Sequence, residues 1–306
     1  MRYGITKTVL SCNDFIEISG EEYENTRTAK RKLAEALNIE EKLNFVLENY
    51  VEYERELLNS SLDSMMFSGR DWSYTVNEIH KVNRRLINLL TTCRLYIDST
   101  KHDINLLFEG DTSQVESLKG QMSNEYDSNI GYRVFEALRN YVQHRSFPIH
   151  NMGHTSTRVD KGSGVFVKHT VAPLIDVAQL KENKGFKSSV LKELESLGEY
   201  VEIRPLLGQY MESLSRIHTF IRDLLAEKVA EWDATILSIL RTYQQAHGDD
   251  LLGLAVVSLD EDERITETVY VFDEHIKRRQ GLMRKNQLVM NLKSHIITSE
   301  SEADGA

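Results

Sequence analysis

The sequence predicts a mainly α protein, an antiparallel helical bundle with β-hairpin insertions and a long helix in the C-terminal half. Three observations support this prediction. Only three prolines occur among the 306 residues, so few helix breakers interrupt the chain. Apolar residues recur at three- and four-residue steps over long stretches, as on the buried face of a helix. Two pairs of short apolar stretches are each separated by turn residues, which is typical of hairpins.

Four helices are expected over roughly residues 20–146. The first covers residues 22–67, as one helix or two consecutive ones, and its apolar row comprises Leu33, Leu37, Leu43, Leu47, Val51, Leu58, Leu62 and Met65. The second begins after Asp71, which is placed to cap it. Gly110 to Ser113 break the pattern, and two shorter helices end near Asn124 and His144. Short connections between consecutive helices favour an antiparallel bundle.

Two hairpins are expected after Pro148 ends the helical pattern. The first pairs residues 155–159 with 165–171 around a Gly-containing turn. A phosphate-binding loop would need the pattern GxxxxGK[ST], which is absent, so these glycines are interpreted as a turn. The second pairs residues 252–259 with 265–272 around an acidic turn. A last helix is expected over residues 274–295.

The long helix lies between the two hairpins. A helix over residues 205–245 would be about 60 Å long at 1.5 Å per residue. Such a helix serves as a dimer arm, a coiled-coil seam or a spine for a second domain, or it is a plain core helix. The predicted domains are a helical bundle over residues 1–150 and an accessory or oligomerisation region over residues 151–298. A disordered tail over residues 299–306 follows.

The composition limits the classes of protein. A net charge of −10 argues against a general coat protein for DNA or RNA, although a local basic site remains compatible with it. Cys12 and Cys93 are the only cysteines, which favours a reducing compartment over a disulfide framework. The chain contains no run of about 20 apolar residues. Its start lacks the features of a signal peptide, so we expect a cytoplasmic protein with no membrane partner.

The segment that best suits chemistry is Arg139-Asn140-Tyr141-Val142-Gln143-His144, at the end of a predicted helix. On a helical wheel the apolar residues of this helix form one stripe, which contains Val134, Phe135, Leu138, Tyr141 and Val142. Asn140 and His144 are four residues apart and share the opposite face, where Arg133 also falls. Arg139 lies about 100° from the stripe, with a side chain long enough to reach round. A solvated polar face is the alternative interpretation.

This segment resembles the signature of the HEPN superfamily, which are small helical bundles with an Arg-x4-6-His motif and often a polar residue after the arginine. In that family the motif ends a late helix of a four- or five-helix antiparallel bundle, and many members are metal-independent ribonucleases. Members act as toxins, anti-phage effectors and RNA-processing enzymes. They are usually dimers whose two motifs meet in one cleft. The resemblance covers residues 20–146, and the two hairpins and the long helix after residue 150 depart from a minimal member.

The resemblance implies a metal-independent endoribonuclease with Arg139, Asn140 and His144 as catalytic residues. Histidine titrates near neutral pH and suits proton transfer, whereas arginine stays charged and stabilises a phosphate. Arg133 and Arg145 are expected to bind the substrate. No cofactor is expected. The expected partners are RNA, a second copy of the chain, and an antitoxin or another protein.

Three further features leave alternatives open. Residues 275–299 carry six cations and no acid, so Lys277, Arg278 and Arg279 are candidate RNA contacts, or else this is a solvated structural face. His144, His150 and His154 are spaced too irregularly for a convincing zinc site. Besides a ribonuclease, the sequence is compatible with a non-catalytic HEPN-like scaffold that binds RNA, nucleotide or protein. It is also compatible with an oligomerisation protein whose functional element is the long helix.

Overall fold

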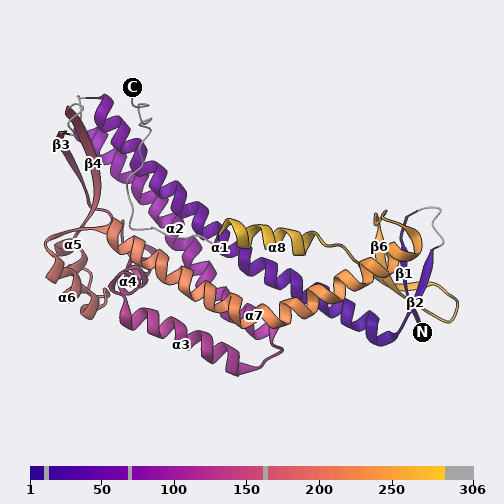
Figure 1. Cartoon of the computed structure of the whole chain (residues 1–306). Helices are drawn as coiled ribbons and strands as arrows, with labels where there is room; N and C mark the ends of the chain where they lie inside the picture. The colour runs from indigo at the N-terminus through magenta and orange to yellow at the C-terminus, as the bar shows by residue number, and fades with distance from the viewer. Residues whose placement is uncertain (10–13, 68–70, 161–164, 287–306) are drawn as a thin grey trace. The chain divides into compact units, whose positions relative to one another are not determined.

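The computed structural model describes residues 1–9, 14–67, 71–160 and 165–286 (Figure 1). The chain divides into two compact units. Among the described residues, unit 1 contains Met1–Phe45, Leu95–Leu118 and residues 219–286. Unit 2 contains Val46–Arg94 and Lys119–His218. The expected boundary at residue 150 therefore falls inside unit 2, and unit 1 combines segments from both sides of it.

Helices dominate the described part of the chain, which confirms the predicted mainly α composition. The eight described helices are α1 (Gly20–Met66), α2 (Trp72–Leu107), α3 (Thr112–Ser128), α4 (Ile130–His144), α5 (Val177–Lys181), α6 (Ser188–Leu197), α7 (Ile203–His247) and α8 (Glu274–Lys285). Helices α1, α2, α3 and α7 each contribute residues to both units. Whether the first four helices form an antiparallel bundle stays a prediction. The remainder of the last predicted helix, residues 287–295, and the predicted tail lie outside the described residues.

Each unit contains one small antiparallel sheet. Unit 1 holds a sheet of order β2-β1-β6-β7, formed by β1 (Arg2–Lys7), β2 (Phe15–Ile18), β6 (Leu254–Leu259) and β7 (Ile265–Tyr270). Unit 2 holds a sheet of order β3-β4-β5, formed by β3 (Asn151–Asp160), β4 (Val165–Asp176) and β5 (Tyr200–Glu202). Both predicted hairpins are confirmed, as β3–β4 and β6–β7. Strands β1, β2 and β5 were not predicted.

The helix boundaries follow the predicted signals. The backbone N–H of Tyr74 donates to the Asp71 carboxylate at 2.8 Å, so Asp71 caps α2 as expected. Gly110 adopts a φ of 85°, a left-handed conformation that glycine tolerates, between the end of α2 and the start of α3. The apolar residues of α7, among them Leu214 and Ile221, are buried by the chain itself. Helix α7 is therefore a core helix, as one of the alternatives stated.

The core of unit 1 is built on β6, in which every residue is buried. The Phe15 ring lies over Gly4, where an added Cβ would approach a ring carbon to 2.2 Å, so only glycine fits there. Arg222 donates to both carboxylate oxygens of Glu40, at 2.8 and 2.7 Å, and satisfies a carboxylate that is almost fully buried.

The apolar row predicted for the first helix is only half correct. Leu33, Leu37 and Leu43 are buried, but Val51, Leu58, Leu62 and Met65 are exposed, at 41 to 56% of their maximal surface. The buried face of α1 in unit 2 instead carries Tyr50, Tyr53 and Leu57. The helical periodicity is confirmed, but the sequence offers no means of telling which of two apolar rows faces the neighbouring helices.

Helix α4 lies directly against α7 in unit 2. The rings of Phe135 and Tyr210 stack with centroids 5.2 Å apart, and Tyr132 packs on the same tyrosine at 5.4 Å. The approach is closest at Gly131, where an added Cβ would lie 2.4 Å from the Leu206 carbonyl oxygen and 2.6 Å from Gln209 Cβ. A backbone carbonyl cannot move aside cheaply, so the contact requires glycine.

We therefore expect Gly131→Ala to destabilise the protein. The added methyl group has to displace α4 from α7, at a cost of about 1–3 kcal/mol, typical of overpacking. Gly120→Ala is the matched control, because Gly120 lies in α3 and a Cβ added there would meet nothing within 4 Å. That variant should gain about 0.5–1 kcal/mol from helix propensity. Urea denaturation of both variants measures the difference, and equal stabilities would contradict the close contact.

Candidate functional site

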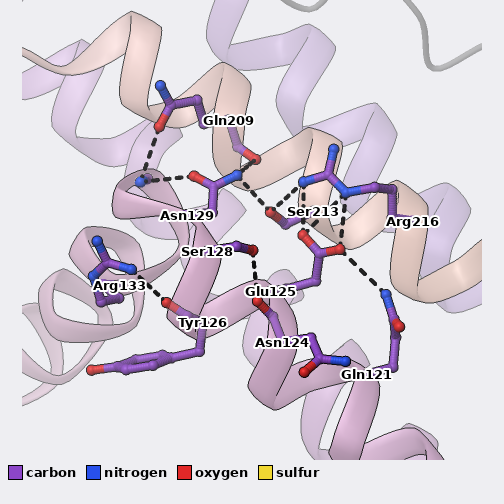
Figure 2. Close-up of polar contacts among 11 residues, drawn as sticks. Gln121, Asn124, Glu125, Tyr126, Ser128, Asn129, Arg133, Gln209, Ser213 and Arg216 are labelled. Carbon is purple, nitrogen blue, oxygen red and sulfur yellow. Dashed lines mark hydrogen bonds and ion pairs between the residues drawn. The ribbon is translucent and has the colours of Figure 1, made fainter.

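Helix α4 is positioned by polar contacts at its first turn (Figure 2). The Asn129 side chain accepts from the backbone N–H of Gly131 at 3.0 Å and so caps the helix. Its amide nitrogen donates to the Ser213 hydroxyl of α7 at 3.0 Å, and the Gln209 side chain accepts from the same Gly131 N–H at 3.1 Å. One asparagine therefore both starts α4 and ties it to α7.

An ion pair between an exposed arginine and a buried carboxylate supports this junction. Arg216 of α7 donates to both oxygens of Glu125 of α3, with its shortest contact at 2.7 Å, and Gln121 adds a donor to the same carboxylate at 3.3 Å (Figure 2). Glu125 is only 5% exposed, so its charge depends on these partners. Helices α3, α4 and α7 are thereby held together where the motif helix begins.

The wheel analysis of α4 is largely confirmed. Val134, Phe135, Leu138 and Tyr141 are buried and Val142 is half-buried, as the apolar stripe predicts. Asn140 and His144 are exposed on the opposite side, so they are accessible to a substrate. The helix ends at His144, and the Arg145 backbone N–H donates to the Tyr141 carbonyl at 2.9 Å.

Arg139 is turned away from this exposed face. It is 8% exposed, and its guanidinium donates to Glu136, one turn earlier, with contacts of 3.0 and 2.9 Å. Its charge also lowers the pKa values of Cys93 and Tyr210, although burial raises both by more. Arg139 therefore lies at the edge of the interior. The structure of one chain does not bring its guanidinium into the hollow that contains His144.

His144 lines an open hollow of about 450 Å³. Arg145 and Phe147 from the segment after α4 contribute to it, and Ile87 of α2 forms part of its wall. Phe147 is 52% exposed, an aromatic ring on the surface beside a histidine and an arginine. Of the predicted residues, the hollow unites His144 with Arg145.

Arg133 is half-buried and is held by contacts within unit 2. Its guanidinium makes a bidentate contact with Glu193 of α6, with the closest atoms 2.8 Å apart, and donates to the carbonyls of Tyr126 and Asp127 at 2.7 and 2.8 Å. These contacts use most of its donors. Arg133 therefore fixes α4 against α6 and the end of α3, and it is not free to bind a substrate in this conformation.

The segment after the motif is anchored by hydrogen bonds to α2 and β4. Asn83 of α2 donates to the Ile149 carbonyl at 2.8 Å and accepts from the Ile149 N–H at 2.9 Å. His150 accepts from the Asp176 N–H at 3.1 Å, and its burial lowers its pKa. His154 contacts Glu78 at 2.8 Å. Within the described ranges no three His, Cys, Asp or Glu side chains come together as a metal site would require.

The predicted basic stretch is engaged within unit 1. Lys277 pairs with Asp273 at 2.8 Å, Arg278 with Glu41 at 2.5 Å, and Arg279 with Asp233 at 2.5 Å. Arg279 is 7% exposed, so it packs between helices and offers no surface for RNA. For Arg279 the structural alternative is the better description, whereas Lys277 and Arg278 are exposed and their contact with RNA stays a prediction. Lys293 of the same stretch lies outside the described residues.

The sequence prediction missed a set of basic side chains on α2. His80, Lys81 and Arg84 are exposed and line a hollow beside the one that contains His144. A signal for them is present, because His80 and Arg84 are four residues apart and share one helical face. It is a weak signal, since such a pair is equally typical of a solvated face beside the apolar stripe of the same helix.

Comparison with known proteins finds no relative of this chain. No protein-family model, no curated protein and no solved structure matches this chain. Within the part of the chain that the structure describes, no helix combines the length and the apolar character needed to cross a bilayer.

Arg279→Ala should strongly destabilise the protein, because it would leave the Asp233 carboxylate, 17% exposed, without its ion-pair partner. Breaking a buried pair in this way costs about 3–5 kcal/mol, and the partial exposure of Asp233 favours the lower end. Lys277→Ala is the control, since its ion pair is 71% exposed on the lysine side and such surface pairs contribute little to stability. Thermal or urea denaturation decides, and a small effect at Arg279 would contradict its structural role.

Proposed function

We propose that this chain is a HEPN-like, metal-independent endoribonuclease in which His144 transfers a proton and Arg139 stabilises the reacting phosphate. The observation that carries the proposal is His144 itself. It ends the predicted motif helix, is exposed, and lines an open hollow with Arg145. A toxin or an anti-phage defence effector is the biological role that such an activity fits.

The chemistry requires two groups. Attack of the 2′-OH on its own phosphate needs a proton removed from that hydroxyl and a proton delivered to the departing 5′-oxygen. His144 is placed for either transfer. Asn140, one turn earlier on the same exposed face, is placed to bind the substrate or to orient His144. Arg145 supplies a cation at the mouth of the hollow.

In this proposal Arg139 enters the site by exchanging its partner Glu136 for the phosphate of the substrate. The Arg139 guanidinium contacts the Glu136 carboxylate in the chain as described. A phosphate presents the same pair of oxygens to a guanidinium as a carboxylate does, so it can replace Glu136. Two copies of the chain related by a two-fold axis near His144 would supply two histidines and two arginines to one groove.

A second candidate function is a non-catalytic HEPN-like scaffold that binds RNA, nucleotide or protein. The burial of Arg139 and its ion pair with Glu136 favour this alternative, because they describe a structural arginine as well as a catalytic one. Loss of His144 separates the two functions, since a scaffold keeps its ligand and has no turnover to lose.

His144→Ala should abolish RNA cleavage. The wild-type protein is expected to cut RNA in EDTA and to leave 2′,3′-cyclic phosphate ends, and the variant should lose about 10²–10⁴-fold in rate. Gel analysis of a labelled RNA together with mass measurement of the product ends tests this. His102→Ala is the control, because His102 is an exposed histidine of α2 in unit 1.

Cleavage that requires added Mg²⁺ would refute the metal-independent mechanism. Equal rates for His144→Ala and the wild type would refute the role of His144. RNA binding without any cleavage by the wild type would favour the scaffold.

The composite site, in which His144 and Arg139 come from two different chains, is tested by mixing two inactive variants. Arg139→Ala and His144→Ala chains should each be inactive alone. A mixture should regain part of the activity, because some dimers carry one intact set of residues. The measurement is cleavage after subunit exchange, with the mass of the assembly determined at the same concentration. An active monomer would exclude the composite site.

A further inference from the structure

A polar groove runs between α1 and α2 in unit 2, beside the His144 hollow. Its volume is about 670 Å³, larger than the 450 Å³ of that hollow. Helix α1 contributes Glu56 and Asp63 to the lining, and α2 contributes Glu78, His80 and two cations, Lys81 and Arg84. The groove is therefore lined by both signs of charge, and what it binds depends on which charges already have partners.

The carboxylates of the groove are engaged within the fold. Glu56 lies 3.6 Å from Arg85, an arginine of α2. Glu78 contacts His154 at 2.8 Å. Asp63 accepts from the Tyr74 hydroxyl at 3.3 Å. Each acid thus has a polar partner within the fold, and the partner of Glu56 is a cation.

The three basic side chains that α2 contributes to the groove differ from the acids, because they form no ion pair with any described residue. Among the described residues, His80, Lys81 and Arg84 form no ion pair, and all three are exposed. A lysine and an arginine that form no ion pair can attract an anionic ligand, and Arg84 can hold a phosphate with two parallel hydrogen bonds. The α2 wall of the groove is therefore its anion-binding side.

An exposed aromatic ring joins the groove to the His144 hollow. Phe147 lines that hollow, and its ring contacts the His80 ring of the groove, with centroids 5.8 Å apart. Along α2, Arg84 of the groove and Ile87 of the hollow are three residues apart, about 4.5 Å along the helix axis. The two hollows are therefore neighbours along α2, and the Phe147 ring of one contacts the His80 ring of the other.

We propose that these neighbouring hollows bind single-stranded RNA, with a base stacked on Phe147 and the neighbouring phosphates held by Lys81 and Arg84. This inference rests on the proposed function, because it supplies the path by which the strand leaves His144. Exposed aromatic rings flanked by cations are the usual way of holding an unpaired strand without reading its sequence. A duplex keeps its bases stacked on one another, so it cannot place one on Phe147.

The test measures binding of a labelled 12-nucleotide RNA to the full chain carrying His144→Ala, which removes the proposed proton-transfer group. Adding Lys81→Glu and Arg84→Glu should weaken binding at least about 10-fold, and should lower the salt slope by roughly 1.4, at about 0.7 per lost phosphate contact. Arg31→Glu with Arg241→Glu is the matched control. Both are exposed arginines of unit 1, and reversing them changes the net charge by the same amount.

Phe147→Leu should weaken binding of the single strand on the order of 10-fold, and Phe147→Tyr should restore most of the affinity, because the ring is kept. A 12-base-pair duplex RNA should show no dependence on Phe147. Lys81→Gln with Arg84→Gln repeats the test without introducing acids, in case charge reversal disturbs the fold.

The outcomes separate this inference from the proposed function. If the parent chain does not bind the strand, or if the matched control loses as much affinity as the groove variant, the proposal that the groove binds RNA is overturned. Cleavage that depends on His144, together with unchanged binding by the groove and Phe147 variants, also overturns RNA binding by the groove. The proposed ribonuclease activity is then unaffected. Binding that falls only in the groove and Phe147 variants supports the groove, even if the wild type proves unable to cleave RNA.

Discussion

The contact between the first turn of α4 and α7 leaves no room for a side chain at Gly131, and the orientation of the whole motif follows from it. Asn129 fixes the position of the helix along its axis by capping it and by binding Ser213. The stacked pair of Phe135 and Tyr210 fixes its rotation. With position and rotation set, a residue's number in α4 decides whether it faces the core or the solvent.

That rotation has opposite effects on the two ends of the motif. His144 is directed outward, whereas Arg139, five residues earlier, comes to the border of the core beside Glu136. Five residues correspond to about 140° on a helix, so a single straight helix cannot aim both side chains at one atom. Any chemistry that uses both residues therefore needs a rearrangement of Arg139 or a second copy of the chain. A purely structural role for Arg139 needs neither.

Local patterns were sufficient to predict most helices and both hairpins, because capping residues, glycines and periodicity act over a few residues. Strands β1 and β2 escaped prediction since they are short and β1 pairs with β6, far away in sequence. The site was predictable to the extent that it depends on one helix, which is why His144 was found on an exposed face. The partners of Arg133, Arg278 and Arg279 lie on other elements, so the sequence could not show that these cations were already engaged.

The pairing of β1 with β6 also affects how the protein is made on the ribosome. Arg2 is the strand partner of Leu259, so β1 emerges long before the strand beside which it belongs. At about 5–20 residues per second, the delay is roughly 13–50 s. During that time only β2 covers one edge of β1, and the other edge is open to pairing with other chains. Nascent chains of this protein should accordingly depend on chaperone protection until the C-terminal third has been synthesised.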